Sequence, residues 1–215
     1  YINPVFARQV VDKIKENQGK PFVTDTNTLY SGMRHNSVDH NTIANLHGFN
    51  FSVLDAPVII ADGIRGQNFI EVEVNGKRFK NVKIASDIIR SDSMIVMSHF
   101  KGHEIAGFGG SIKNLAMGCA PAAGKKDQHN VEIQSDNNTC IACGRCAEVC
   151  PEAAIVVDDY AVIDPNKCIG CGECITACPV DAIGMDWESE IEPFMERMTE
   201  YAYGDKKKKK DKVGY

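Results

Sequence analysis

Eight of the nine cysteines in this chain of 215 residues lie between Cys140 and Cys178, in two groups with the same spacing. The first group reads Cys140-x2-Cys143-x2-Cys146-x3-Cys150-Pro151, and the second reads Cys168-x2-Cys171-x2-Cys174-x3-Cys178-Pro179. This run, repeated once, is typical of bacterial segments that bind two iron-sulfur clusters, in which the fourth cysteine of each run binds the other cluster. The cysteines therefore constrain the fold of this segment more than any other feature of the sequence.

The spacing predicts two 4Fe-4S clusters with crossed ligands. Each iron of such a cluster takes one soft thiolate, and a tight loop with cysteine at every third position reaches only three of them. The fourth ligand must come from the other group. We expect one cluster on Cys140, Cys143, Cys146 and Cys178, and the other on Cys168, Cys171, Cys174 and Cys150.

Disulfides and structural zinc are the two alternatives for these cysteines. A disulfide framework is typical of secreted chains, and the N-terminus lacks the pattern of a secretory signal. Structural zinc usually binds two Cys-x2-Cys pairs separated by a longer insert, not three cysteines in a row. The match between Ala153-Ala154-Ile155 and Asp181-Ala182-Ile183, each after a motif proline, also indicates an internal repeat. These observations favour the clusters.

The charge distribution narrows the classes of partner. The formal net charge is -5, and residues 140–200 alone contain 13 acidic and 3 basic side chains. So acidic a segment repels nucleic acid, and it predicts a redox partner with a basic docking surface. The sequence has no apolar run of membrane-spanning length, so we expect no membrane partner and a cytoplasmic protein.

Before the cysteines, helices alternate with short apolar strands. Asn3 and Pro4 are typical of a helix start, and Asn75-Gly76 lies between two alternating segments, which predicts a hairpin. The alternation predicts an α/β fold with a mostly parallel sheet, flanking helices and a β-hairpin. The cysteine motif predicts that an α+β ferredoxin domain of the bacterial two-cluster type follows it. We expect strands at 22–24, 58–61, 70–74, 79–84 and 94–98, and helices at 4–18, at 38–46 and near Asp87. We expect domains at 1–133, 134–187 and 188–215. The last of these is a C-terminal helix with a Lys-rich segment that returns to the α/β domain.

Polar side chains follow three of the expected strands. In parallel sheets the carboxyl ends of the strands meet at one edge, where ligands usually bind. Asp25 follows the strand expected at 22–24, and His99 and His103 follow the strand expected at 94–98. Lys113 lies at the start of the next expected helix, after a Gly-rich loop that exposes backbone amides. We take Asp25, His99, His103 and Lys113 as candidate catalytic residues for a small-molecule ligand, although surface loops are often polar without a function.

These residues resemble one protein family. The stretch from His99 to His103, the stretch from Gly109 to Cys119 and the doubled cysteine motif are similar to the family called domain of unknown function 362, as are Thr24 to Thr28 and Ala61-Asp62-Gly63. The resemblance implies a protein that binds 4Fe-4S clusters, as members of the family, many of them from anaerobes, are mainly described, and it implies no particular reaction. Members of the family are longer at both ends, so we expect this chain, which begins at Tyr1, to be an internal part of a longer protein.

Three functions are compatible with these features. The first is electron transfer, in which two clusters connect a redox partner with the α/β domain. The second is an oxidoreductase that acts on a small molecule near His99, His103 and Lys113, with the clusters as the electron relay. The third is a maturation factor that hands on a cluster. The first is our leading expectation.

Overall fold

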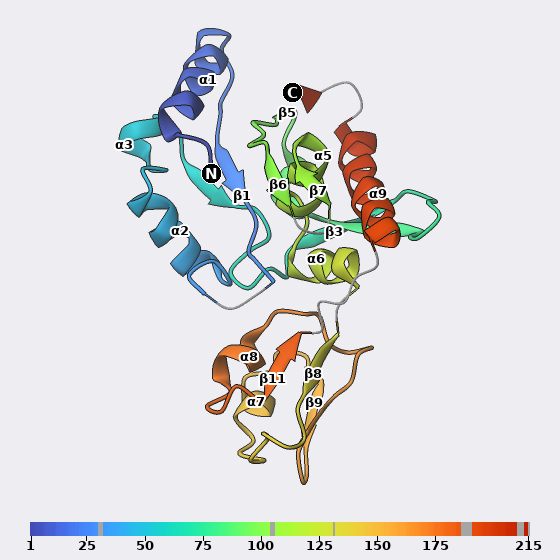
Figure 1. Ribbon diagram of the computed structural model, residues 1–215. Coiled ribbons are helices and arrows are strands. Elements are labelled where there is room, and N and C mark those ends of the chain that lie inside the picture. Colours follow the sequence, from blue (N-terminus) through green and yellow to red (C-terminus); the bar gives the residue numbers. More distant parts are fainter. Residues whose placement is uncertain (30–31, 104–105, 131, 186–190, 210–212, 215) are drawn as a thin grey trace.

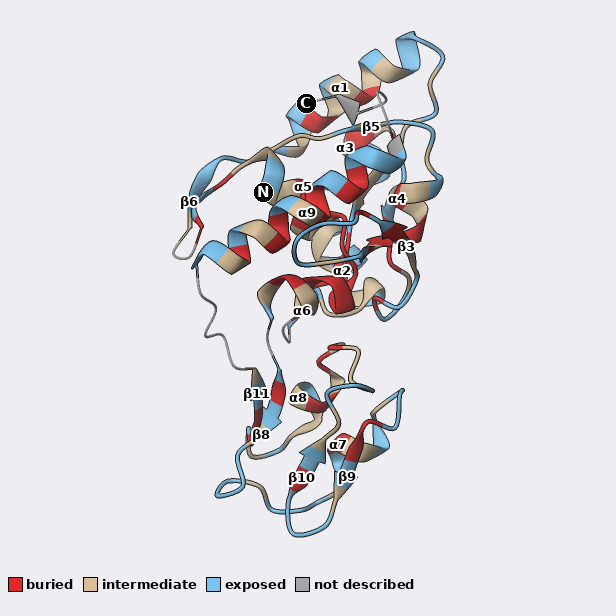
Figure 2. Ribbon diagram, turned by 90° about the vertical axis from the view of Figure 1, so that its right-hand side faces the viewer, coloured by how far each residue is buried: buried red, intermediate tan, exposed pale blue. Residues whose placement is uncertain are grey.

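The computed structural model describes residues 1–29, 32–103, 106–130, 132–185, 191–209 and 213–214 (Figure 1). They form two lobes, one above the other in Figures 1 and 2. We call residues 132–185 the cysteine lobe. The other described residues form the α/β lobe, which the chain leaves before the cysteine lobe and rejoins after it. The predicted boundary at residues 187 and 188 lies outside the described residues.

The α/β lobe contains short strands and helices in alternation. The helix α1 begins at Pro4, and the side chain of Asn3 caps it by accepting a hydrogen bond from the N–H of Val5 at 2.9 Å, as predicted. The elements are α1 (Pro4–Glu16), β1 (Val23–Asp25), α2 (Ser37–Leu46), α3 (Phe51–Leu54), β2 (Val58–Ile60), β3 (Phe69–Glu73), β4 (Asn81–Ala85), α4 (Ser86–Arg90), β5 (Met94–Ile95), β6 (Lys101–His103), β7 (Gly107–Gly109), α5 (Ser111–Gly118), α6 (Ala122–His129), α9 (Ile191–Lys209) and β12 (Val213–Gly214).

The cysteine lobe is built from two copies of one small unit. Each copy consists of a strand, a cysteine-bearing loop, a short helix and a second strand. The elements are β8 (Ile133–Ser135), α7 (Arg145–Glu148) and β9 (Ile155–Val157) in the first copy, and β10 (Ala161–Ile163), α8 (Glu173–Ala177) and β11 (Ile183–Met185) in the second. The copies exchange strands, because β8 pairs with β11 and β9 pairs with β10, both antiparallel.

The prediction of a mostly parallel sheet is wrong. The described strands form two-stranded sheets, of which β1–β2 and β5–β12 are parallel and the others are antiparallel. The reason lies in the connections. Helices α2 and α3 separate β1 from β2 and let the chain return in the same direction, whereas β3–β4 and β6–β7 are joined directly and must run antiparallel. Alternation of helix and strand predicts parallel pairing only where a helix separates the two strands.

The β3–β4 hairpin is confirmed, and it carries the core of the α/β lobe. Val72 pairs with Val82, and a hydrogen bond from the N–H of Gly76 to the carbonyl of Phe79 closes the reversal. One face of the hairpin packs against α5 and α9, and Phe194 and Tyr201 of α9 are fully buried there. Figure 2 shows this core as the buried parts of α5, α9 and β3. A helix that follows the cysteine lobe in sequence thus completes the core of the lobe that precedes it.

Candidate functional site

The eight cysteines of the repeated motif line two cavities in the cysteine lobe. Each takes three cysteines from one loop and the fourth from the other copy of the unit. The first is lined by Cys140, Cys143, Cys146 and Cys178, and the second by Cys168, Cys171, Cys174 and Cys150. The remaining surroundings of both cavities are largely apolar.

Matched backbone geometry produces the two cysteine loops. Gly144 and Gly172, which precede the short helices, have left-handed φ angles of 77° and 79°. In each copy a backbone N–H also donates to the sulfur of the fourth cysteine, from Ala154 to Cys150 Sγ at 3.3 Å and from Ala182 to Cys178 Sγ at 3.2 Å. Such N–H groups stabilise negative charge on sulfur.

The electrostatic environment of the sulfurs differs between the loops. Desolvation, followed by the charge of neighbouring cysteines, raises the pKa of Cys174 to about 12. Desolvation also raises the pKa of Cys171 and of Cys146. By contrast, backbone N–H groups of Ala142 and Ala161 lower the pKa of Cys140. The second loop is therefore the more desolvated of the two.

Four cysteines line each of the two cavities. Within the described ranges, no group of three or more His, Cys, Asp or Glu side chains has the arrangement that would hold a single metal ion. All nine cysteines are free thiols. Four soft sulfur donors around an apolar cavity suit a group with several metal atoms, each bound to one sulfur.

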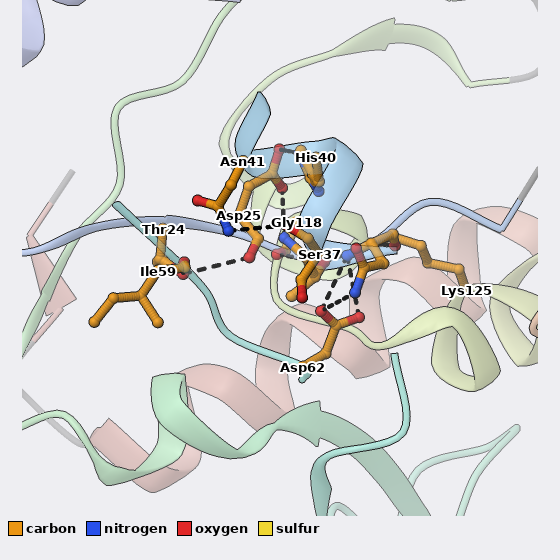
Figure 3. A network of polar contacts seen from close by, with 11 residues as sticks. Thr24, Asp25, Ser37, His40, Asn41, Ile59, Asp62, Gly118 and Lys125 are labelled. Atoms are coloured by element: carbon orange, nitrogen blue, oxygen red, sulfur yellow. Dashed lines mark hydrogen bonds and ion pairs between the residues drawn. The ribbon is translucent and has the colours of Figure 1, made fainter. Parts of the chain in front are cut away.

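A second polar constellation lies where β1 and β2 end (Figure 3). The carboxylate of the fully buried Asp62 accepts hydrogen bonds from the backbone N–H of Asn27 at 3.1 Å and from its Nδ2 at 2.9 Å. The buried Lys125 donates to Thr26 Oγ1 at 2.6 Å and to the carbonyl of Asn27. Two of the three predicted strand-end loops therefore meet.

Charges in this constellation influence one another. Desolvation raises the pKa of Asp62 and lowers the pKa of Lys125, and the attraction between the two groups opposes both shifts. Desolvation acts to raise the pKa of Asp25 as well, but the hydrogen bond with His40 and the charge of Lys125 outweigh it, and the pKa lies below its usual value. The His40 Nε2 to Asp25 Oδ2 distance is 3.7 Å. The constellation is thus a coupled set of two carboxyls, a lysine and a histidine.

The other candidate catalytic residues lie elsewhere in the α/β lobe. His103 stacks on the ring of Phe194 with centroids 6.4 Å apart, and Lys113 Nζ lies 5.9 Å from the centroid of that ring. Desolvation, with a contribution from Lys101, lowers the pKa of Lys113 to about 8. His99 is exposed. His103 and Lys113 thus share the ring of Phe194, whereas Asp25 lies beside His40, so the structure brings two of the four candidates together.

Three side chains of the α/β lobe contact the second cysteine loop. Lys126 Nζ donates to the carbonyl of Cys168 at 2.8 Å, and Arg65 forms an ion pair with Glu173 at 3.2 Å. The third is Leu29, whose Cδ1 would lie 3.3 Å from a Cβ on Gly170. The loop that continues β1 therefore runs from Asp25 to the wall of the second cavity.

Sequence reasoning missed His40, Lys125 and Lys126. His40 lies within a helix whose sequence gives no sign that it faces a carboxylate. Lys125 and Lys126 form an ordinary pair in α6, and burial of the first against Asp62 arises only from tertiary packing. The presence of Asp62 directly after a buried strand was the one signal that could have pointed to this constellation.

The fold and the two cavities define a class: a two-lobed α/β protein with a doubled cysteine-rich unit inserted between α6 and α9. The model of the family described as Domain of unknown function (DUF362) matches residues 1–207. The chain belongs to this family. Comparison with curated proteins found no match. Among the helices of the described ranges, none has the length and apolar character needed to cross a bilayer.

Proposed function

We propose that this protein binds two 4Fe-4S clusters in its cysteine lobe and transfers electrons between a redox partner and the α/β lobe. One observation carries the proposal: each of two cavities is lined by four cysteines, three from one loop and the fourth from the other copy. This grouping is the one that the spacing of the bacterial two-cluster motif implies.

The arrangement suits a cluster better than zinc. Four zinc ligands must approach one point at about 2.3 Å in a tetrahedron. The described cysteines do not converge in this way. In a 4Fe-4S cluster each thiolate binds a different iron, so the four sulfurs stand around a cavity. The predominantly apolar lining of both cavities also favours a compact inorganic group.

The surroundings of the loops support a route for the electrons. Bound clusters would supply one-electron redox chemistry near each loop. Cys143 is exposed, whereas the second loop lies against Leu29, Arg65 and Lys126 of the α/β lobe. An external partner can thus approach the first cavity beside Cys143, and the second adjoins the polar constellation around Asp25.

Metal and sulfide analysis of anaerobically purified protein tests the proposal. We expect about eight irons and eight sulfides per chain, with the electron paramagnetic resonance of reduced 4Fe-4S clusters. Cys119→Ala is the matched control, because Cys119 is buried in the α/β core, apart from both cavities. It should retain all the iron. Stoichiometric zinc, or protein that takes up no iron on anaerobic reconstitution, would contradict the proposal.

A second function, reduction of a small molecule by the α/β lobe, is favoured by the low pKa of Lys113. A lysine with a pKa of about 8 can donate or accept a proton near neutral pH, as acid–base catalysis requires. His103, which contacts the same aromatic ring, is its neighbour. Reductase activity that survives in a His103→Ala, Lys113→Ala double variant would exclude this site.

A further inference from the structure

The first cysteine loop has an exposed surface where the second loop has a covered one. In the second loop a Cβ on Gly170 would lie 2.8 Å from Lys126 Cδ and 3.3 Å from Leu29 Cδ1, so the α/β lobe leaves no room for a side chain. In the first loop Ala142 takes the place of Gly170. It has the same left-handed conformation, with φ 52° against 74°, and it is exposed. Its neighbour Ile141 is 60% exposed.

The charged residue at the matched position has the opposite sign. Glu173 follows Gly172 in the second loop and pairs with Arg65 of the α/β lobe at 3.2 Å. In the first loop Arg145 follows Gly144 and is exposed. It is the sole charged residue between Cys140 and Cys146, and residues 132–185 contain just one other cation, Lys167. The two loops thus share a backbone but present inverted charges.

We infer that the first loop is a docking surface for a redox protein that covers Ile141 and Ala142 with apolar side chains and places a carboxylate against Arg145. The inference rests on the proposed function, since docking there serves electron exchange with the first cavity. The second loop shows how such a loop is covered. Leu29 of the α/β lobe packs against it, and Arg65 pairs with Glu173. The partner makes the equivalent contacts to the first loop.

This surface favours an acidic partner, although the net charge of residues 140–200 suggests a basic one. Net charge counts every side chain, whereas a docked partner contacts few of them. Glu148, at the other end of α7, is exposed and repels an acidic protein at long range. Salt at about 0.1 M limits such repulsion to about 10 Å and leaves the contact pair with Arg145 less affected.

Electron exchange with two soluble carriers of opposite charge tests the inference. The chemically reduced protein is mixed in a stopped-flow instrument with flavodoxin, an acidic carrier, or with cytochrome c, a basic one, at about 0.1 M salt. We expect Arg145→Glu and Ile141→Asp each to slow the reaction with flavodoxin by about tenfold. Arg145→Glu should not slow the reaction with cytochrome c.

Matched variants separate the surface from general effects. Lys80→Glu makes the same charge change at an exposed site in the β3–β4 hairpin, and Val38→Asp replaces an apolar residue of similar exposure, 65%, in α2. Both should leave the rates with flavodoxin within about twofold. Iron content and the rate with methyl viologen report directly on the clusters, and unmodified protein that lacks iron would count against the proposed function. If both are normal and Arg145→Glu leaves flavodoxin unaffected, or slows cytochrome c alone, the inference is overturned.

Discussion

The two cysteine loops have the same spacing and the same backbone, yet they differ in what surrounds them. Ile141 of the first loop is 60% exposed, whereas its counterpart Ile169 is partly covered and Gly170 is buried. Desolvation raises the pKa of Cys174 to about 12, whereas backbone N–H groups lower the pKa of Cys140. Local sequence thus determines the loop geometry, whereas the contact with the α/β lobe determines which loop is covered. Two cysteine loops that share one motif therefore need not have the same function.

The largest expected effect comes from breaking the crossing of the fourth ligands. Cys150→Ala and Cys178→Ala should each remove one cluster, leaving about four irons of eight. The spectrum of Cys150→Ala should match that of Cys171→Ala, and the spectrum of Cys178→Ala that of Cys143→Ala, as the cavity linings require. Paramagnetic resonance of the four variants checks this. If Cys150→Ala resembles Cys143→Ala, each loop binds its own fourth cysteine and the crossing is refuted.

The next largest expected effect is on the pH dependence of stability, which should differ between the two lobes. Desolvation, with the charges of Lys113, His103 and Arg197, lowers the pKa of His129 to about 4. An unfolded histidine has a pKa near 6.5, so between about pH 6.5 and pH 4 the unfolded chain binds a proton that the folded chain does not. The free energy of unfolding of the α/β lobe therefore falls as pH falls through this window, by at most about 3 kcal/mol.

Hydrogen exchange measured by lobe at pH 7 and pH 5.5 checks this expectation. All six histidines precede residue 130, so the cysteine lobe has none. Exchange should speed up in α6 and α9 relative to β8 and β11 after correction for the intrinsic pH dependence. His129→Gln should reduce the difference. An unchanged pH response in this variant would show that another group is responsible.

Exchanging the loop residues at matched positions should give effects of different size. Gly170→Ala places a Cβ against Lys126 and Leu29 in a left-handed backbone, and should destabilise the protein by about 1–3 kcal/mol. Ala142→Gly relieves a left-handed alanine on an open surface and should change stability by less than about 1 kcal/mol. Urea unfolding of the two variants measures both. Equal destabilisation by the two changes would mean that the loops are not differently covered.

The smallest expected effect is on reduction potential. Lys126 Nζ donates to the carbonyl of Cys168 beside the second cavity, and a positive charge there favours the more negative, reduced form of a bound cluster. Lys126→Met should lower the potential of that cluster by about 30–60 mV, where 59 mV is a tenfold change for one electron. Lys126→Arg should restore most of it. A redox titration in which both clusters shift equally would remove the distinction between the loops.

Much of the fold could be predicted because short-range rules determine it. The cap at Asn3, the helix near residues 38–46 and the β3–β4 hairpin depend on neighbours in sequence, and all are present. The sheet arrangement depends on which strands pair across long separations, and periodicity carries no information about that choice. The pairing of β5 with β12 is an example, because the two strands lie far apart in the sequence.

The candidate sites divide in the same way. The spacing of the cysteines limits which of them one loop can bring together, so the sequence alone predicts how the eight thiols are grouped. The role of Lys125 cannot, because its burial beside Asp62 arises when α6 packs over the ends of β1 and β2. Asp25 was recognisable from its place after a strand, whereas its partner His40 gave no signal.

The position of α9 has a consequence for how the protein is made. This helix supplies Phe194, Met198 and Tyr201 to the α/β core, but it follows the cysteine repeats in the chain. During synthesis the ribosome releases the repeats first, while the earlier-made hairpin still lacks the helix that covers its apolar face. The segment in the middle of the chain can therefore reach its final form before the segment at the start. A nascent chain stalled before α9 would expose Val72, Val82 and Ile84, and would be a target for chaperones and proteases rather than a smaller working protein.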